Sequence, residues 1–335
     1  MFESRSSSTE TPSAFPRWLG DIGGTNARFG WQEYEGGPIS RVQVLPCAEY
    51  PSLLDAANAY LLQQGLTAPQ SAAFGIANPV TGDRITMTNH HWTFSVDELR
   101  NSLGLTRLLF LNDFTALALS ITRLPAEEKR QIGGGEATPD SAVGLIGPGT
   151  GLGVSGLLPL GYQNKWIPIS GEGGHVSLSA STPFEFSVIE HLHKRYGHVS
   201  AERALSGTGL VDLYHALCDL GDGEGREITT PAEVMARAHA VPASKANQAL
   251  DMFCGFLGSV AGDLALTLGA RGGIYIGGGI APRMLERMEQ GPFRARFEAK
   301  GRFREYLKGI PTWVICSPVS PALLGASQAL SLTQW

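Results

Sequence analysis

The first regular pattern in the chain is an apolar run that ends in glycines and resumes as an alternation of apolar and polar residues. The run ends in Leu19, Gly20, Asp21 and Ile22, and the pair Gly23–Gly24 follows it. Apolar side chains then occupy every second position of 27–31. A period of two predicts a strand, whereas Walker and Rossmann loops need a helix after their glycines. We therefore predict a hairpin whose turn presents backbone N–H groups to a phosphate, with Asp21 facing a phosphate-bound metal through water. An ordinary hairpin turn has the same pattern.

The same pattern returns at 143–157, where an apolar strand is followed by Pro148, a Gly-Thr-Gly turn and a second alternating strand. Two such hairpins suggest two similarly built halves that face one nucleotide. A glycine stretch at 133–135, which we predict to be flexible, precedes this hairpin. A third glycine run follows an apolar strand at 272–280 and offers bare backbone to an adenine or a ribose. A strand-to-helix turn is the alternative interpretation of that run.

Polar residues follow two further strands in the first third of the chain. The strand at 72–77 ends at Asn78, and the strand at 107–111 ends at Asn112 and Asp113, before a helix at 114–121. Ligand chemistry gathers at the carboxyl ends of strands in α/β sheets, which favours a catalytic role for Asp113. Asp is also among the best helix N-caps, so a structural role is equally compatible with the pattern.

Two acids and a histidine stand out after the second hairpin. Three glycines surround Glu172 and His175, which predicts a bend whose backbone approaches a ligand closely while the two side chains project. A surface loop is the alternative. Further on, Ser200 is predicted to cap a short helix that holds Glu202, and Glu202 then points either to solvent or into a cleft.

Helical periodicity recurs along the rest of the chain. It predicts helices that open at Pro51, begin near Val96, and cover 184–192, 231–240, 247–268 and 321–330. In the helix at 247–268, Gly255, Gly258 and Gly262 lie near one face and allow another backbone to pack closely. The last helix is expected to return to the first domain.

Composition and charge are those of a globular enzyme of 335 residues, with 43% apolar residues, 17% charged residues and a net charge of −5. This charge gives no general attraction to nucleic acid or to anionic membranes, so phosphates must be bound locally by loops. Four cysteines lie far apart and suggest neither a disulfide framework nor a zinc cluster, which favours reduced thiols in the cytoplasm. The uncharged stretch at 141–163 is interrupted by glycines and prolines, so no membrane span is predicted there.

From about Trp18 to about Leu330, the chain resembles the bacterial glucokinases, ATP-dependent glucose kinases of the non-ROK type. The resemblance depends on six ordered motifs, at 20–28, 87–90, 112–116, 149–153, 171–175 and 197–203. It implies a two-domain α/β fold of the actin and ribonuclease-H-like type with an interdomain cleft. It also implies the transfer of phosphate from ATP to D-glucose, the first step of glycolysis, with Mg2+ bridging the terminal phosphates.

The resemblance also implies a role for each matched residue. Asp113 would be the general base on the 6-hydroxyl, and the sugar would be bound by Asn112, Asp113, Glu172, His175 and Glu202. The phosphates and the metal would be held by Gly20, Asp21, Ile22, Gly23, Gly24 and Thr25. The other side of the phosphates would contact Gly149, Thr150 and Gly151, and the adenosine would contact Gly277, Gly278 and Gly279. Pro148 and Asn78 depart from the small residues usual in the family, and Pro148 has no N–H to donate.

The expected organisation is a flexible tail at 1–16, a small α/β domain at 17–122 completed by 319–335, and a large α/β domain at 123–318. A homodimer is also expected. Three alternatives are a ROK sugar kinase, a sugar-sensing regulator and an ATP-driven chaperone or filament protein. The chain lacks the cysteine and histidine zinc motif of ROK kinases, a DNA-reading module ahead of Trp18, and a spare segment for peptide binding or polymer contacts.

Overall fold

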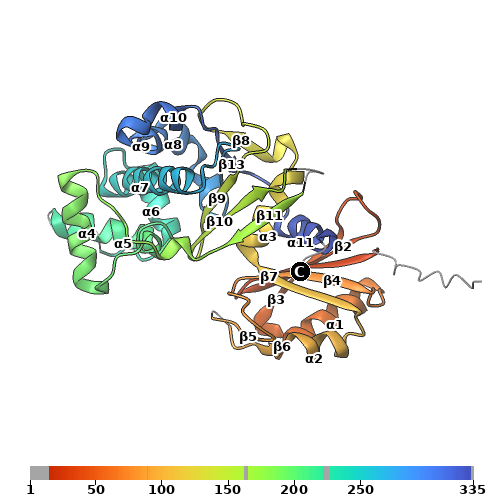
Figure 1. Ribbon diagram of the computed structural model, residues 1–335. Helices are drawn as coiled ribbons and strands as arrows, with labels where there is room; N and C mark the ends of the chain where they lie inside the picture. Colours follow the sequence, from red (N-terminus) through yellow and green to blue (C-terminus); the bar gives the residue numbers. More distant parts are fainter. Residues whose placement is uncertain (1–14, 89, 162–164, 222–225, 333–335) are drawn as a thin grey trace, which may run out of the picture. The chain divides into compact units, whose positions relative to one another are not determined.

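The computed structural model describes residues 15–88, 90–161, 165–221 and 226–332 of the chain. Two compact units are present: unit 1 comprises Met1–Arg123 and Ser320–Trp335, and unit 2 comprises Leu124–Val319 (Figure 1). The tail expected at 1–16 lies outside the described residues except for its last two positions. Each unit is built around one mixed β-sheet with helices packed on it.

Unit 1 contains a five-stranded sheet with the order β3-β2-β1-β4-β7. The strands are β1 (Arg17–Ile22), β2 (Asn26–Gln32), β3 (Ser40–Pro46), β4 (Ser71–Ile76) and β7 (Arg107–Asn112). The first three form an antiparallel meander, and β4 and β7 then extend the sheet in parallel with β1. A separate two-stranded hairpin, which the sequence pattern did not predict, consists of β5 (Arg84–Thr86) and β6 (Thr93–Ser95).

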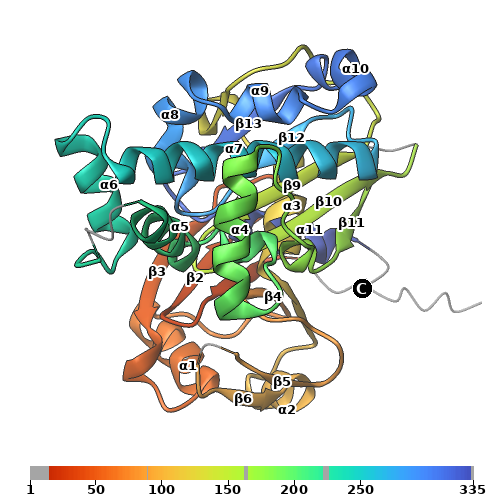
Figure 2. The ribbon, with the colours of Figure 1, turned by 90° about the vertical axis from the view of Figure 1, so that its left-hand side faces the viewer.

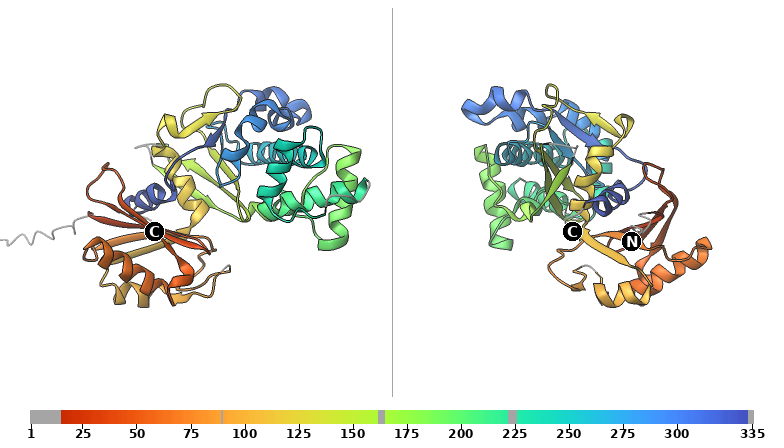
Figure 3. Two further views of the ribbon diagram at one scale, coloured as in Figure 1. Left: turned by 180° about the vertical axis from the view of Figure 1, so that it is seen from behind. Right: turned by 45° about the vertical axis from the view of Figure 1, so that its right-hand side comes forward.

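The two faces of this sheet pack on different helices because successive side chains of a strand alternate between faces. Trp18 and Phe74 belong to the core that includes α1 (Leu53–Gln64) and α2 (Val96–Ser102). Leu19 belongs to the opposite core, which includes α11 (Ala322–Ser331). The last helix also packs along α3 (Asp113–Ser120), and the two lie side by side in Figure 3. The short helices η1 (Cys47–Glu49) and η2 (Ile121–Arg123) complete unit 1.

Unit 2 repeats the strand arrangement of unit 1. Its strands are β8 (Lys129–Gln131), β9 (Val143–Pro148), β10 (Leu152–Pro159), β11 (Trp166–Ser170), β12 (Ile274–Ile276) and β13 (Thr312–Ile315). Their order is β11-β10-β9-β12-β13-β8, in which β9, β10 and β11 form a meander and β12 and β13 run parallel to β9. The first five positions therefore match the sheet of unit 1 strand for strand, as the two similar glycine hairpins led us to expect.

Helices fill the rest of unit 2, and the longest, α7 (Lys245–Leu268), contacts α5 (Gly207–Leu220), α6 (Pro231–Ala240) and α9 (Phe293–Glu298) (Figure 2). The remaining helices are η3 (Ala126–Glu128), η4 (Gly173–His175), α4 (Pro183–Tyr196), η5 (Ala201–Arg203), η6 (Ala281–Met284), α8 (Leu285–Gln290), η7 (Gly301–Phe303) and α10 (Arg304–Lys308). Among the described residues, α7 is the one helix whose length and composition would suit a membrane span, and 67% of that window is buried within the fold.

The predicted glycine face of α7 is a close helix contact. A Cβ atom at Gly258 would lie 2.1 Å from the Phe293 carbonyl oxygen, and one at Gly262 would lie 2.6 Å from that of Phe297. Both carbonyls belong to α9, so α9 lies against the backbone of α7 at a distance that only glycine permits. Gly255 contributes less, because its Cβ would be 3.4 Å from the Arg296 guanidinium.

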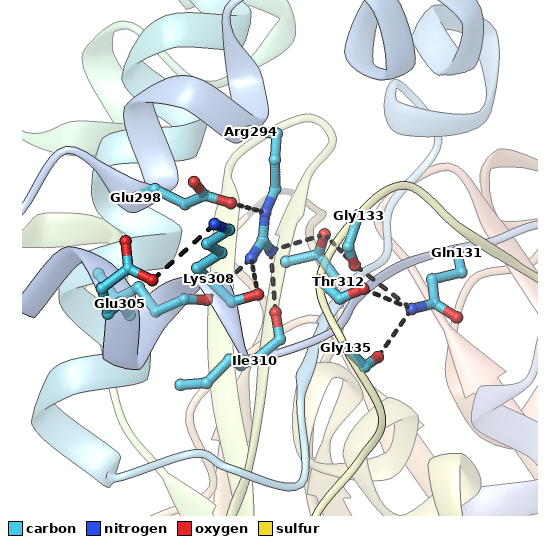
Figure 4. A network of polar contacts seen from close by, with 11 residues as sticks. Gln131, Gly133, Gly135, Arg294, Glu298, Glu305, Lys308, Ile310 and Thr312 are labelled. Atoms are coloured by element: carbon cyan, nitrogen blue, oxygen red, sulfur yellow. Dashed lines mark hydrogen bonds and ion pairs between the residues drawn. The ribbon is translucent and has the colours of Figure 1, made fainter.

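The glycine stretch at 133–135 is held in place, contrary to the prediction that it is flexible. The Gly133 carbonyl accepts a hydrogen bond from the Thr312 N–H at 3.0 Å, and the Gln131 amide donates to the Gly135 carbonyl at 3.0 Å (Figure 4). At Gly134, where φ is +88°, a Cβ would lie 2.2 Å from the Ile310 carbonyl oxygen. The Arg294 guanidinium donates to that same Ile310 oxygen at 2.9 Å, so one network fixes both segments. These glycines therefore permit close packing rather than motion.

The other predicted elements are mostly confirmed, with two corrections. The helix expected to open at Pro51 begins at Leu53, because the Ser52 side chain is its N-cap and accepts from the Asp55 N–H. Ser200 occupies the N-cap position of η5 as predicted, but its side chain makes no capping hydrogen bond, and its backbone forms an isolated β-bridge with Ser177.

Candidate functional site

The first glycine turn joins β1 to β2 as predicted. The Gly23 N–H donates to the Asn26 carbonyl at 2.9 Å and closes the turn. Cys47 also holds the turn: its N–H donates to the Thr25 carbonyl at 2.8 Å, and its thiol donates to the Gly23 carbonyl at 3.4 Å. Burial raises the pKa of Cys47 to about 11, so the thiol stays protonated and able to donate. Within the described chain, the N–H groups of Gly24 and Thr25 have no acceptor, which leaves them available to an anion.

Asp21 is paired with an arginine that the sequence analysis did not single out. The register of β1 and β2 places Asp21 opposite Arg28, and the guanidinium lies 2.8 Å from the Asp21 carboxylate. The two side chains are 20% and 32% exposed, so the pair is accessible from solvent. Counting outward from the turn along both predicted strands would have found this partner. One carboxylate oxygen of Asp21 binds Arg28, and the other can accept from a metal-bound water.

Asn112 is the last residue of β7, and Asp113 is the first residue of α3. The N-cap of α3 is Asn112, whose Oδ1 accepts from the N–H groups of Phe114 and Thr115 at 2.9 and 3.2 Å. Asp113 is the first residue of the helix, and its carboxylate also accepts from the Phe114 N–H at 2.9 Å. The interpretation of Asp113 as the N-cap is therefore wrong, since the cap is its neighbour. Both side chains are half-buried.

The segment after Asn78 is tied to the core of unit 1. Asn78 is 9% exposed, and its Oδ1 accepts from the Thr88 N–H at 2.9 Å, which gives this departure from the family pattern a structural role. Trp92 is 2% exposed and packs in the core of unit 1. Asn89, which belongs to the motif at 87–90, lies outside the described residues.

The second glycine turn, at 149–151, joins β9 to β10 as predicted. The Gly149 N–H donates to the Gly151 carbonyl at 2.8 Å, and the Gly149 carbonyl accepts from the Gly207 N–H at 2.9 Å. Both the N–H and the carbonyl of Gly149 are therefore hydrogen-bonded within the fold. In the described part of the chain, the N–H groups of Thr150 and Gly151 have no acceptor. Each of the two turns thus offers two adjacent backbone donors, the arrangement that suits a phosphate.

The third glycine run lies against the second turn. The Gly277 N–H donates to the Ile146 carbonyl at 2.9 Å, and the Ile280 N–H donates to the Pro148 carbonyl at 3.3 Å. Gly278 has a φ of +78°, and a Cβ there would lie 2.3 Å from the Pro148 carbonyl oxygen. Pro148, which has no N–H, thus contributes its carbonyl to hold the run in place.

The run continues into η6, so the strand-to-helix alternative is correct for the backbone. Beyond it lies a cavity of about 200 Å³ within unit 2. Residues of α6, α7, η6 and α8 line the cavity: Met235, Ala238, His239, Leu250, Arg283, Met284, Glu286 and Arg287.

The loop of Glu172 and His175 packs on the second hairpin. A Cβ at Gly174 would lie 2.1 Å from the Leu152 carbonyl oxygen, and one at Gly173 would lie 2.8 Å from the Val154 side chain. These glycines permit close approach to strand β10, whereas the sequence led us to expect close approach to a ligand. The Glu172 and His175 residues are exposed, so their side chains remain accessible.

Glu202 points back onto the same hairpin. Its Oε2 accepts from the Leu152 N–H at 2.9 Å, although the two residues are 50 positions apart. The segment of Glu202 is also joined to that of His175, because the Ala201 N–H donates to the Val176 carbonyl at 2.8 Å. The candidate sugar ligands of unit 2 and the second glycine turn therefore belong to one assembly of contacts around Leu152.

A family model for glucokinase matches residues 18–333. The glucokinase of Aromatoleum aromaticum is 55% identical over 323 residues, which cover 96% of this chain and 96% of that protein. The chain belongs to the glucokinase family. The family match confirms the predicted class of enzyme, a sugar kinase of the hexokinase type, and favours it over the regulator and chaperone alternatives.

Solved structures agree with this family. The crystal structure of glucokinase from an Antarctic psychrotroph has a TM-score of 0.85 at 33% identity and covers 94% of this chain and 98% of its own. A ROK family glucokinase from Streptomyces griseus, solved with glucose and AMPPNP, has a TM-score of 0.63 at 20% identity and covers 94% of this chain and 99% of its own. The predicted α/β fold of the actin-like type is confirmed by these neighbours.

The predicted site residues of this glucokinase-family chain fall into two groups, one in each unit. Unit 1 holds Gly20, Asp21, Ile22, Gly23, Gly24, Thr25, Asn112 and Asp113. Unit 2 holds Gly149, Thr150, Gly151, Glu172, His175, Glu202, Gly277, Gly278 and Gly279. None of the four cysteines, which all lie among the described residues, forms a disulfide, and the described residues contain no group of three or more His, Cys, Asp or Glu side chains suited to a metal ion.

Proposed function

We propose that this chain transfers the terminal phosphate of ATP to the 6-hydroxyl of D-glucose and so supplies glucose 6-phosphate to glycolysis. The observation that carries the proposal is the assembly around Leu152, in which one strand end carries a turn with free N–H donors and contacts the segments of Glu172, His175 and Glu202. A sugar kinase requires N–H donors for the phosphates close to side chains that bind the hydroxyls of the sugar. The Streptomyces griseus protein, whose crystal structure holds glucose and AMPPNP, supports this choice of substrates.

Asp113 is proposed to accept the proton of the 6-hydroxyl. A sugar hydroxyl is a weak nucleophile, and a carboxylate within hydrogen-bond reach accelerates its attack by about 10²–10⁴. The cap on α3 is supplied by Asn112, so the Asp113 carboxylate is not required to start the helix. Asn112, Glu172, His175 and Glu202 would bind the remaining hydroxyls, and a hydroxyl of the wrong stereochemistry would leave one of these groups unpaired.

The two glycine turns are proposed to hold the phosphates through the N–H groups of Gly24, Thr25, Thr150 and Gly151. Mg2+ would arrive with ATP and neutralise the charge of the terminal phosphates, and the free oxygen of Asp21 would face it through a water. The adenosine would lie along Gly277, Gly278 and Gly279, with the cavity beyond η6 receiving the base between apolar side chains such as Met235 and Met284. We further propose that the enzyme is cytoplasmic and that it forms a homodimer. Sedimentation of the purified protein tests the homodimer.

The proposed reaction is tested by measuring ADP release from ATP with a panel of hexoses that includes glucose, mannose and glucosamine. We expect the highest kcat/KM for glucose. Glucose 6-phosphate must appear in equal amount to ADP, because simple ATP hydrolysis also releases ADP. The absence of a sugar-dependent rate with every hexose would refute the proposal, and a higher kcat/KM for another hexose would replace its substrate.

A further inference from the structure

The hydrogen bond between Glu202 and Leu152 acts on the peptide group that closes the second phosphate turn. This peptide group joins Gly151 to Leu152. Its carbonyl accepts from the Gly149 N–H at 2.8 Å, and its N–H donates to Glu202 Oε2 at 2.9 Å. Since a peptide group is planar, holding both ends fixes its orientation. The Gly151 N–H belongs to the adjoining peptide group, which shares the Gly151 Cα with this plane, so fixing the plane restrains that donor from one side.

The Glu202 carboxylate also fills the space beside the turn. A Cβ atom at Gly151 would lie 2.4 Å from Glu202 Oε2, so the position next to the carboxylate requires glycine. Glu202 is half-buried: its carboxylate lies against the turn, and part of its side chain remains accessible. A carboxylate held against a phosphate-binding turn has a cost, because its charge repels phosphate.

The backbone that carries Glu202 is itself fixed from several directions. The Ala201 N–H donates to the Val176 carbonyl at 2.8 Å, and the Leu178 N–H donates to the Val199 carbonyl at 2.9 Å. On the next residue, the Arg203 guanidinium lies 4.2 Å from the centre of the Tyr196 ring. The Tyr196 hydroxyl in turn donates to Asp212 at 2.5 Å. Glu202 therefore acts on the turn from a rigid base.

We propose that Glu202 is a positioning residue for the phosphate turn, in addition to its proposed contact with the sugar. Oε2 orients the peptide group between Gly151 and Leu152, and Oε1 is left for a sugar hydroxyl. One carboxylate then serves both substrates, so the binding of sugar and the shape of the phosphate turn are coupled. By linkage, glucose tightens nucleotide binding by the same factor as nucleotide tightens glucose binding. This inference depends on the proposed function for the sugar contact but not for the hydrogen bond to the turn.

The test measures nucleotide affinity in the absence of sugar, where a residue that only binds sugar has no effect. The variants are Glu202→Ala, which removes the acceptor, and Glu202→Gln, which keeps a neutral oxygen for the Leu152 N–H. The matched control is Glu172→Gln, because Glu172 is a proposed sugar ligand whose side chain has no hydrogen bond to the turn among the described residues. Isothermal titration calorimetry with Mg2+ and AMPPNP gives the dissociation constant, and circular dichroism confirms that each variant is folded.

We expect Glu202→Ala to bind AMPPNP about tenfold more weakly than the wild type without sugar, because loss of the charge-assisted hydrogen bond that orients the turn outweighs the relief of repulsion between the carboxylate and phosphate. Glu202→Gln should lose less affinity than Glu202→Ala, and Glu172→Gln should bind AMPPNP like the wild type. Unchanged AMPPNP affinity in Glu202→Ala would overturn the proposal, even if its KM for glucose rises. Equal losses in Glu202→Ala and Glu172→Gln would also overturn it. If the wild type binds AMPPNP but phosphorylates no sugar, the proposed function fails while the role of Glu202 at the turn is still measured.

Discussion

The adjacent residues Asn112 and Asp113 allow structure and catalysis to be separated by experiment. In Asp113→Asn the helix cap remains, because Asn112 still accepts from the Phe114 and Thr115 N–H groups at 2.9 and 3.2 Å. The Phe114 N–H also donates to Asp113, so it keeps one acceptor when the carboxylate is replaced. The substitution also removes a negative charge from the first turn of α3, a helix-dipole effect worth about 0.3–1 kcal/mol. Catalysis should fall much further, by about 10²–10⁴ in kcat, if the carboxylate is the general base.

The assay compares three variants by kcat, KM for glucose and urea unfolding. Asp113→Asn should lose kcat with a nearly normal KM, whereas Asn112→Ala should lose about 1 kcal/mol of stability through its missing cap. Asp97→Asn is the matched control, since Asp97 lies in the first turn of α2 and has no proposed role in the reaction. It should show a similar small loss of stability and wild-type kcat. A kcat for Asp113→Asn within tenfold of the wild type would refute the assignment of the base.

Three further predictions concern the packing behind the site. Gly174→Ala should reduce activity while the protein stays folded, because the added methyl would lie 2.1 Å from the Leu152 carbonyl; wild-type kinetics would contradict this. Glu185→Ala should cost about 3 kcal/mol in urea unfolding, at the low end for a broken buried pair, because the Arg296 guanidinium, 17% exposed, loses its carboxylate and keeps only the Ser181 and Ser259 hydroxyls; a loss below 1 kcal/mol would refute that reasoning. The pKa of Cys47, about 11 against an ordinary value of 9.0, means that the thiol stabilises the fold below pH 9 and loses this effect between pH 9 and 11. The difference in unfolding free energy between the wild type and Cys47→Ser should therefore shrink over that range, and a constant difference would disprove it.

The hairpins could be predicted from the sequence because their signal is local. Alternation with a period of two on each side of the glycines is a property of the neighbouring residues alone, and it correctly distinguished 19–31 from a Walker or Rossmann loop. The cap of α3 was ambiguous because Asn112 and Asp113 are adjacent and are almost equally good N-caps. Only the backbone dihedral angles at the strand end decide between them.

Contacts between distant residues were not predictable in the same way. The direction of Glu202 was left open in the sequence, and its partner Leu152 lies 50 residues earlier. The stretch at 133–135 looks flexible by composition, but it is fixed by Thr312 and Ile310, which follow far later in the chain. Glycine has two uses, freedom of the backbone and lack of a side chain, and composition alone does not reveal which one applies.

The position of α11 has a consequence for how the protein is made. Unit 1 contains the earliest residues described, yet α11, which covers one face of its sheet, follows the whole of unit 2 in the chain. A ribosome synthesises unit 2 before it reaches α11, so Leu19 and Ala73 remain without their helix throughout that time. Unit 1 is thus completed only after unit 2 has been synthesised, and its maturation waits on the residues of α11.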